Sequence, residues 1–113
     1  MTAQPALDLP DLPELVEPDY EPELTIAERY ALFHEANPHV YRALEILATQ
    51  WLWRNRRVGV KALFEQLRWQ SGITTDVRPY VLDNNFTAHY ARALLAAHPE
   101  WEGRIVTRAL RSP

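Results

Sequence analysis

The stretch PHVYRALEILATQWLWR (residues 38–54) decides the fold, because its apolar side chains repeat with helical spacing. The main stripe consists of Val40, Leu44, Leu47 and Trp51. Its flank consists of Tyr41, Ala48 and Leu52, and its narrow polar edge of Arg42, Glu45 and Thr49. A helix that is apolar around most of its circumference must be covered on several sides. We therefore expect residues 38–54 at the centre of the core, with Trp51 buried.

A helix is also predicted just before this segment. Thr25 and Glu28 have the spacing of a capping box, in which each side chain binds the other residue's free amide at a helix start. Asn37 and Pro38 then predict a stop, followed by a new N-cap with proline at the first helical position. The folded part is therefore expected to begin at residue 25.

Two more helices and a strand are predicted after residue 57. Apolar spacing favours a helix over residues 60–71 that Gly72 ends, and another over residues 85–98. Residues 73–83 are ambiguous: Thr74, Thr75 and Asp76 suggest a turn, and residues 80–82 could be a brief strand. Residues 104–110 are rich in β-branched side chains and alternate enough to predict a strand, which could pair back onto residues 57–59.

Length and composition limit the classes of protein to consider. A chain of 113 residues, 47% hydrophobic and 24% charged, is expected to form one domain plus a tail. Because it has no cysteine, disulfides and thiolate metal sites are excluded. No apolar run is long enough to span a bilayer, and the first residues lack the pattern of a signal peptide. We expect a cytoplasmic protein without membrane partners.

Charge divides the chain into two parts. Residues 1–28 contain eight acidic residues and no Lys or Arg, whereas the whole chain has a net charge of -3. Residues 29–113 therefore carry a net charge of +5. The most concentrated part of this positive charge is WLWRNRRVGVK (residues 51–61), with four cationic side chains among two tryptophans.

Residues 1–24 are predicted to be an acidic, proline-rich arm, separate from a folded domain over residues 25–113. The arm holds five of the nine prolines, which oppose both helix and sheet, so an extended and mobile segment is expected. Apolar residues between the acids suggest a docking tail for a protein partner or for the domain's own basic face. A solubilising tail with no ligand is the alternative. The candidate partner-binding residues are Leu12, Leu15, Val16 and Tyr20.

Catalytic and metal-binding patterns are weak. His34 and His39 are five residues apart with a proline between them, so they do not share the helical face of a zinc-protease motif. His89 and His98 have no clustered carboxylates, and the three glycines are isolated. We expect no enzyme activity, no metal and no cofactor.

The order of the predicted elements favours a mainly α fold of four helices with a small β-wing, like a winged helix-turn-helix. Residues 85–98 would then be the recognition helix, with Asn84 and Asn85 at its N-terminal end. Its exposed side would carry Thr87, Ala88, Ala91, Arg92 and Leu95. The alternative is that this side packs against another helix or a second copy of the chain.

A phosphate-binding rim could flank that helix. Its predicted members are the cations Arg54, Arg56, Arg57, Lys61, Arg104, Arg108 and Arg111. The candidate nucleic-acid-binding residues are thus Arg54, Arg56, Arg57, Lys61, Asn84, Asn85, Thr87, Arg92, Arg104 and Arg108. Trp53 could stack on a base, although a tryptophan beside a helix end is more often a border of the core.

Residues 29–111 resemble a family of short uncharacterised proteins from bacterial and phage genomes. The matching features are Phe33-His34, Asn37-Pro38, Val40-Tyr41, residues 56–61, Leu63-Phe64-Glu65, Leu67-Arg68-Trp69, Leu82, Asn84-Asn85, Tyr90-Ala91-Arg92, Pro99 and residues 108–111. The resemblance implies a phage or prophage context. Similar sequences tend to carry three asparagines where this one has Asp83 before Asn84 and Asn85, which puts base reading by position 83 in doubt.

Two hypotheses follow for function. The first is a small nucleic-acid-binding protein, for which DNA is the expected ligand, whose acidic arm modulates binding by competing with phosphate. The second is a protein-interaction adaptor or inhibitor that docks on a host or phage protein through the arm. The two differ in which segment carries the interaction.

Overall fold

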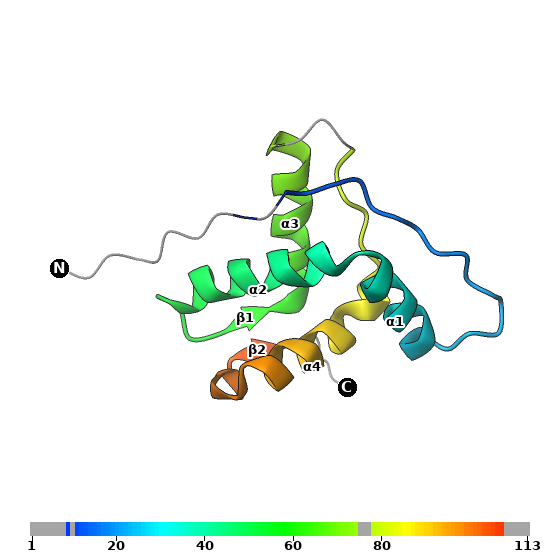
Figure 1. Cartoon of the computed structure of the whole chain (residues 1–113). Coiled ribbons are helices and arrows are strands. Elements are labelled where there is room, and N and C mark those ends of the chain that lie inside the picture. Colours follow the sequence, from blue (N-terminus) through cyan, green and yellow to red (C-terminus); the bar gives the residue numbers. More distant parts are fainter. Residues whose placement is uncertain (1–8, 10, 75–77, 108–113) are drawn as a thin grey trace.

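The computed structural model describes residues 9, 11–74 and 78–107 of the chain. Within these residues the fold is mainly helical with a small two-stranded sheet, as the sequence predicts. The elements in chain order are α1 (Ile26–Ala36), α2 (Pro38–Leu52), β1 (Val58–Gly59), α3 (Val60–Thr74), the 3-10 helix η1 (Asn84–Phe86), α4 (Thr87–Ala97), the 3-10 helix η2 (Pro99–Trp101) and β2 (Ile105–Val106). Figure 1 shows α2 crossing the middle of the molecule, with α3 rising from one side and α4 running below.

The central position of α2 confirms the interpretation of residues 38–54. Six of its residues are buried: Val40, Ala43, Leu44, Leu47, Ala48 and Leu52. The helix ends at Leu52, two residues earlier than predicted. Trp51 is 51% exposed, so the prediction that it belongs to the core is wrong. It lies in the last turn, where the indole Nε1 donates to the carbonyl oxygen of Arg57 at 2.7 Å and the ring turns toward the following loop.

The start of α1 is the predicted capping box. The amide of Glu28 donates to Thr25 Oγ1 at 3.1 Å, and the amide of Thr25 donates to Glu28 Oε1 at 2.8 Å. Asn37 stands between α1 and α2 as predicted, but its side chain makes no capping bond to α2. It is fully buried and binds the N-terminal arm instead. Asn37 therefore occupies the predicted N-cap position, but its side chain binds Val16 of the arm and not the first turn of α2.

Gly72 does not end α3, which continues to Thr74. A Cβ at position 72 would lie 3.2 Å from Cγ of Pro79, on the chain segment that returns along the helix. The glycine is therefore used for close approach between two segments rather than as a helix stop. The Ser71 hydroxyl accepts the amide of Tyr80 at 2.9 Å and fixes the same crossing. Residues 80–82 form neither strand nor helix, so the brief strand is not present. The part of the predicted turn at residues 75 and 76 lies outside the described residues.

The sheet joins two distant segments. Val58 pairs with Ile105 and Gly59 with Val106, as expected for a final strand that returns to residues 57–59. The pairing is parallel. The connection between the two strands includes α3 and α4, so it is long enough for the crossover that a parallel pair requires. The part of the predicted strand at residues 108–110 lies outside the described residues.

The described part of the arm packs on the domain. Leu12 is 5% exposed and belongs to the core, with Leu9 and Leu15 packed against it. The Tyr80 hydroxyl donates to the carbonyl oxygen of Pro13. Figure 1 shows this segment passing over α2 and turning down to α1. Residues 11–24 form no helix or strand, as predicted, and the contacts of Leu12, Pro13 and Val16 show that this segment packs on the domain instead of standing apart from it. Its mobility stays a prediction.

Candidate nucleic-acid interface

The loop between α2 and β1 concentrates positive charge at the surface. Arg54, Arg56 and Arg57 are exposed, and Lys61 is exposed in the first turn of α3. None of these four side chains forms an ion pair with a carboxylate among the described residues. The four cations are therefore available to an anionic ligand, and we call them the basic loop.

Backbone hydrogen bonds give the basic loop a fixed course. The carbonyl oxygen of Trp51 accepts from the amide of Arg54 at 3.2 Å and from the amide of Asn55 at 3.0 Å. The Asn55 side chain donates to the same carbonyl at 2.9 Å. The amide of Val58 donates to the carbonyl oxygen of Arg104 at 2.9 Å. The cationic side chains therefore project from an ordered turn.

Arg104 has a structural role in this turn. Its guanidinium donates to the carbonyl oxygens of Leu52 and Asn55 at 2.9 Å each, and to that of Arg56 at 3.0 Å. Three of its five N–H groups thus bind one free carbonyl at the end of α2 and two carbonyls in the loop that follows. The structure brings Arg104 to the basic loop, as predicted, but uses it to position the loop. Arg108, predicted beside it, lies outside the described residues.

Two tryptophans border the same loop. Trp51 is 51% and Trp53 is 45% exposed. The hydrogen bond from Trp51 to Arg57 holds the first indole against the turn. Exposed rings beside arginines form the combination that stacks on bases and binds phosphates. Sequence reasoning missed Trp51 because its place on the apolar stripe of α2 is also that of a core residue.

A groove of about 480 Å³ opens between α2 and α3, with Trp51 on its wall. Apolar side chains from three elements line it: Leu47, Val58, Ala62 and Leu63. Its polar lining consists of Gln50, Arg54, Asn55 and Gln66, and the remaining wall is Trp51. The volume is within the roughly 300–1,000 Å³ of small-ligand sites. Because Arg54 of the basic loop also lines the groove, beside Trp51, the groove adjoins the basic loop.

The other predicted nucleic-acid-binding residues lie elsewhere. The amide of Asn85 donates to Asp83 Oδ1 at 2.9 Å, and the Thr87 hydroxyl donates to the carbonyl oxygen of Asn84 at 3.0 Å. The side chain that caps η1, just before α4, is therefore that of Asp83 and not that of Asn84 or Asn85. Asn84 and Asn85 are exposed and Thr87 is half-buried, at the end of α4 that packs near α1.

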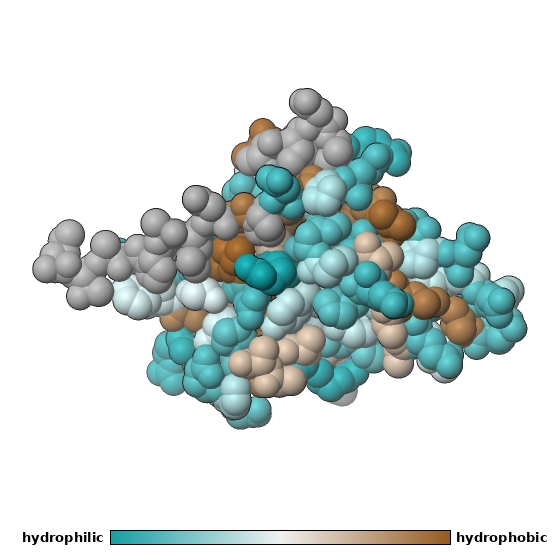
Figure 2. Space-filling model, in the orientation of Figure 1, coloured by the Kyte–Doolittle hydropathy of each residue, from teal (hydrophilic) through white to brown (hydrophobic). Residues whose placement is uncertain are grey.

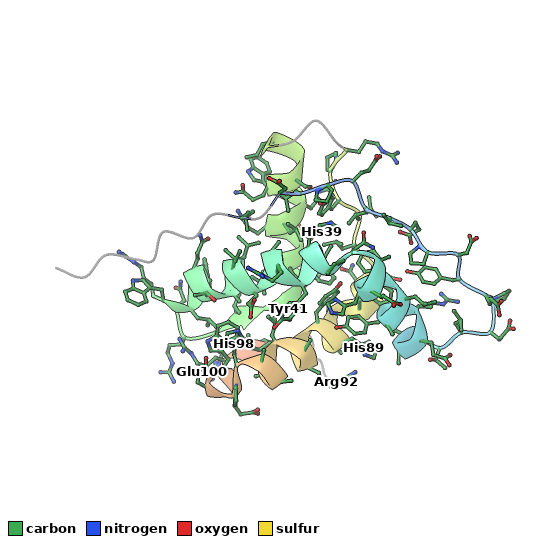
Figure 3. The ribbon with its side chains drawn as sticks, in the orientation of Figure 1. His39, Tyr41, His89, Arg92, His98 and Glu100 are labelled. Carbon is green, nitrogen blue, oxygen red and sulfur yellow. The ribbon has the colours of Figure 1, made fainter. Side chains whose placement is uncertain are left out.

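Arg92 also belongs to the side of α4 near α1. Its Nη2 lies 3.0 Å from Nδ1 of His89, whose ring stacks on Tyr30 with 5.1 Å between centroids. Figure 3 shows Arg92 and His89 apart from His98 and Glu100, which mark the other end of α4. Ala91, predicted to face a groove of DNA, is 1% exposed. The prediction of a recognition helix with an open face is therefore wrong at Ala91, because this side of α4 packs in the core.

A group of titratable residues fastens the end of α4 to α2. His98 Nε2 lies 2.7 Å from Glu45 Oε2, and His98 Nδ1 lies 3.2 Å from Glu100 Oε2. Trp101 stacks on the imidazole with 3.9 Å between ring centroids. Burial lowers the pKa of His98, but its hydrogen bonds and proximity to the two glutamates raise it more, so the net pKa is raised. The imidazolium form is thus favoured.

The surroundings of Glu45 complete this group. The Tyr41 hydroxyl donates to Glu45 Oε2 at 3.4 Å, and Arg42 Nε lies 3.9 Å from Glu45 Oε1. Burial and then Glu45 raise the pKa of Tyr41 to about 12, so Tyr41 stays neutral. No sequence pattern predicts this group, because its central pair, Glu45 and His98, is separated by 53 residues in the chain.

Comparison with protein-family models, with curated proteins and with solved structures finds no match. In the described residues no helix is both long enough and apolar enough to cross a membrane. The same residues contain no group of three or more His, Cys, Asp or Glu placed to hold a metal ion. The interface must therefore be interpreted from its own geometry.

Proposed function

We propose that the protein binds nucleic acid, specifically DNA, through the basic loop and the two adjoining tryptophans. The observation that carries the proposal is the exposure of Arg54, Arg56, Arg57 and Lys61 without a carboxylate partner among the described residues. Phosphate contacts of this kind supply most of the affinity of non-specific nucleic-acid binding. The phage or prophage setting rests on the resemblance alone and is part of the same proposal.

The exposed indoles favour nucleic acid over other anions. Trp51 and Trp53 present flat apolar surface beside the cations, and base stacking contributes about 1–3 kcal/mol per base in proteins that combine these groups. A simple anion such as inorganic phosphate would use the cations and leave the rings in water. The two residue types together are best satisfied by a ligand that has both phosphates and bases.

The adaptor hypothesis has less support from the described part of the arm. Leu12, one of its four candidate contacts, is buried in the protein's own core. Val16 is exposed, but its backbone binds Asn37 in both directions. Docking through Leu12 would require the arm to leave the domain. Removing residues 1–24 would also remove a core residue, so loss of a partner on truncation does not separate binding from unfolding.

Salt dependence of binding tests the proposal. The full chain is titrated with fluorescent oligonucleotides at several salt concentrations, and the logarithm of the affinity is plotted against that of the salt concentration. The slope is about -0.7 per neutralised phosphate for single strands and about -0.9 for duplexes. The double variant Arg56→Gln/Arg57→Gln is expected to reduce the magnitude of the slope by about 1.4 on a single strand.

The matched control is Arg68→Gln/Arg78→Gln, which removes the same charge from two exposed arginines near the arm. We expect it to keep the slope of the wild type. If both double variants weaken binding equally, net charge alone is responsible and the basic loop is not the interface. If the wild type binds no oligonucleotide at low salt, the proposed function is wrong.

A further inference from the structure

The groove between α2 and α3 has features beyond those that phosphate binding needs. We infer that it holds an unpaired base, so that the ligand is single-stranded DNA; this inference rests on the proposed function. Leu47, Val58 and Leu63 supply an apolar lining, and Trp51 supplies a ring at its edge. A base could then lie against apolar side chains while its phosphates contact Arg54 and its neighbours.

The walls of the groove match the chemistry of a base. A flat base needs apolar contact on its faces and hydrogen-bonding groups at its edge. Gln66 brings a side-chain amide, which donates and accepts, to the same groove as Leu47 and Leu63. Among the described residues, Asn55 uses one N–H for the Trp51 carbonyl and keeps its second N–H and its oxygen for a ligand. The hydrogen bond from Trp51 to the carbonyl oxygen of Arg57 keeps the indole in place before ligand binds.

Charge complementarity identifies the occupant. Arg54 lines the groove, and Arg56, Arg57 and Lys61 lie within seven residues of it in the chain. A neutral apolar ligand would leave this charge unused. An acidic peptide would need an apolar side chain next to its acids to fill the recess, whereas every nucleotide of a nucleic-acid strand carries both a phosphate and a flat base. The C5-methyl of thymine suits the apolar lining. The methyl is the feature by which we assign DNA, because uracil in RNA lacks it.

Accessibility favours a single strand over a duplex. The groove is a recess between two helices, and a paired base reaches such a recess only after unstacking, which costs a few kcal/mol. No cost of this kind applies to a strand whose bases are already unpaired. The side of α4 that would have entered a duplex groove is closed by packing at Ala91.

The test compares five oligonucleotides of equal length with the full chain, by fluorescence anisotropy at low salt. They are a thymidine strand, its abasic analogue with the same phosphates, a deoxyuridine strand, a uridine RNA strand and a duplex. We expect the thymidine strand to bind tightest and the abasic strand at least about fivefold more weakly, the lower limit for losing one stacked base. Loss of one buried methyl is expected to weaken the deoxyuridine strand about fourfold.

Filling the groove supplies an independent test. Ala62 is an exposed α3 residue on the groove wall, so Ala62→Trp is expected to close the groove without removing core packing. The expected result is loss of most of the preference for the thymidine strand over the abasic strand, with stacking on Trp53, outside the groove, accounting for what remains. Ala96→Trp, at an exposed position of α4, is the matched control and is expected to keep the preference. Trp51→Leu is a second variant that should reduce the same preference if Ala62→Trp fails to fold.

Each contrary outcome has a distinct meaning. If the wild type binds thymidine and abasic strands equally and the Arg56→Gln/Arg57→Gln variant loses both, the base site and stacking on the tryptophans are wrong, and nucleic-acid binding by the basic loop stands. If no oligonucleotide binds, the proposed function fails. Tighter binding of the duplex overturns the assignment to a single strand. Tighter binding of the RNA overturns the assignment to DNA.

Discussion

Replacing Asn37 by alanine should weaken the attachment of the N-terminal arm to the domain and destabilise the fold. The Asn37 side chain is fully buried at the junction of α1 and α2. Its Oδ1 accepts the amide of Val16 at 2.8 Å, and its Nδ2 donates to the carbonyl oxygen of Val16 at 2.8 Å and to that of Phe33 at 3.0 Å. One amide therefore satisfies both backbone groups of an arm residue that belongs to no helix or strand.

The magnitude follows from which groups lose a partner. Phe33 keeps one, because its carbonyl oxygen also accepts the amide of Asn37 at 2.9 Å. The N–H and C=O of Val16 lose theirs, and each buried group left unsatisfied costs about 1–3 kcal/mol. Because these bonds are partly buried and water can reach the opened site, we expect the lower end for both groups. Asn37→Ala should therefore lower the free energy of unfolding by about 2 kcal/mol.

Urea unfolding followed by circular dichroism measures this loss. Asn37→Asp is the sharper variant, because it keeps the size and one acceptor oxygen but places a second oxygen against two carbonyls. We expect it to destabilise the protein at least as much as alanine does at neutral pH. Asn85→Ala, at an exposed position, is the control and should change stability by less than about 0.5 kcal/mol. A stability of Asn37→Asp equal to that of the wild type would refute the reasoning.

Two further predictions concern the far end of α4 and the basic loop. Because the pKa of His98 is raised above its ordinary 6.5, its pairing with two glutamates contributes full stability below about pH 6.5 and loses it as the pH rises through the folded-state pKa. Melting temperatures between about pH 5 and 9 should show this loss in the wild type and not in His98→Gln; parallel curves would contradict the role of His98. Arg104→Lys keeps the charge but cannot reach three carbonyls, so we expect about 1–2 kcal/mol less stability in urea. Retention of full stability would show that the guanidinium bonds do not hold the loop.

The helical framework could be predicted because its signals are local. The apolar stripe of α2 and the capping box at Thr25 and Glu28 depend on residues within a few turns of one another. Trp51 shows the limit of this reasoning. Helical periodicity assigns a residue to a face of the helix, but it does not say how far along the helix other elements pack on that face. On the apolar stripe of α2, Leu47 is buried and Trp51 is exposed.

The errors arose where a side chain has a partner that is distant in sequence. Asn37 has the sequence position of a cap, yet its amide binds Val16, 21 residues earlier in the chain. Gly72 looks like a helix stop, yet it admits Pro79 beside a helix that continues. Both residue types serve local and long-range purposes equally well, so only the packed structure distinguishes the two uses.

The basic loop brings several positive charges together, and hydrogen bonds from nearby and distant residues hold it in place. Like charges placed close together destabilise a fold, and three arginines within residues 54–57 do so at one turn. The turn is held by bonds to backbone carbonyls from Arg104, Asn55 and Trp51, none of which neutralises its charge. The stabilising groups thus fix the geometry and leave the repulsion in place. A phosphate chain would relieve that repulsion without changing the turn, so the ordered turn supports the proposal that the ligand is a nucleic acid.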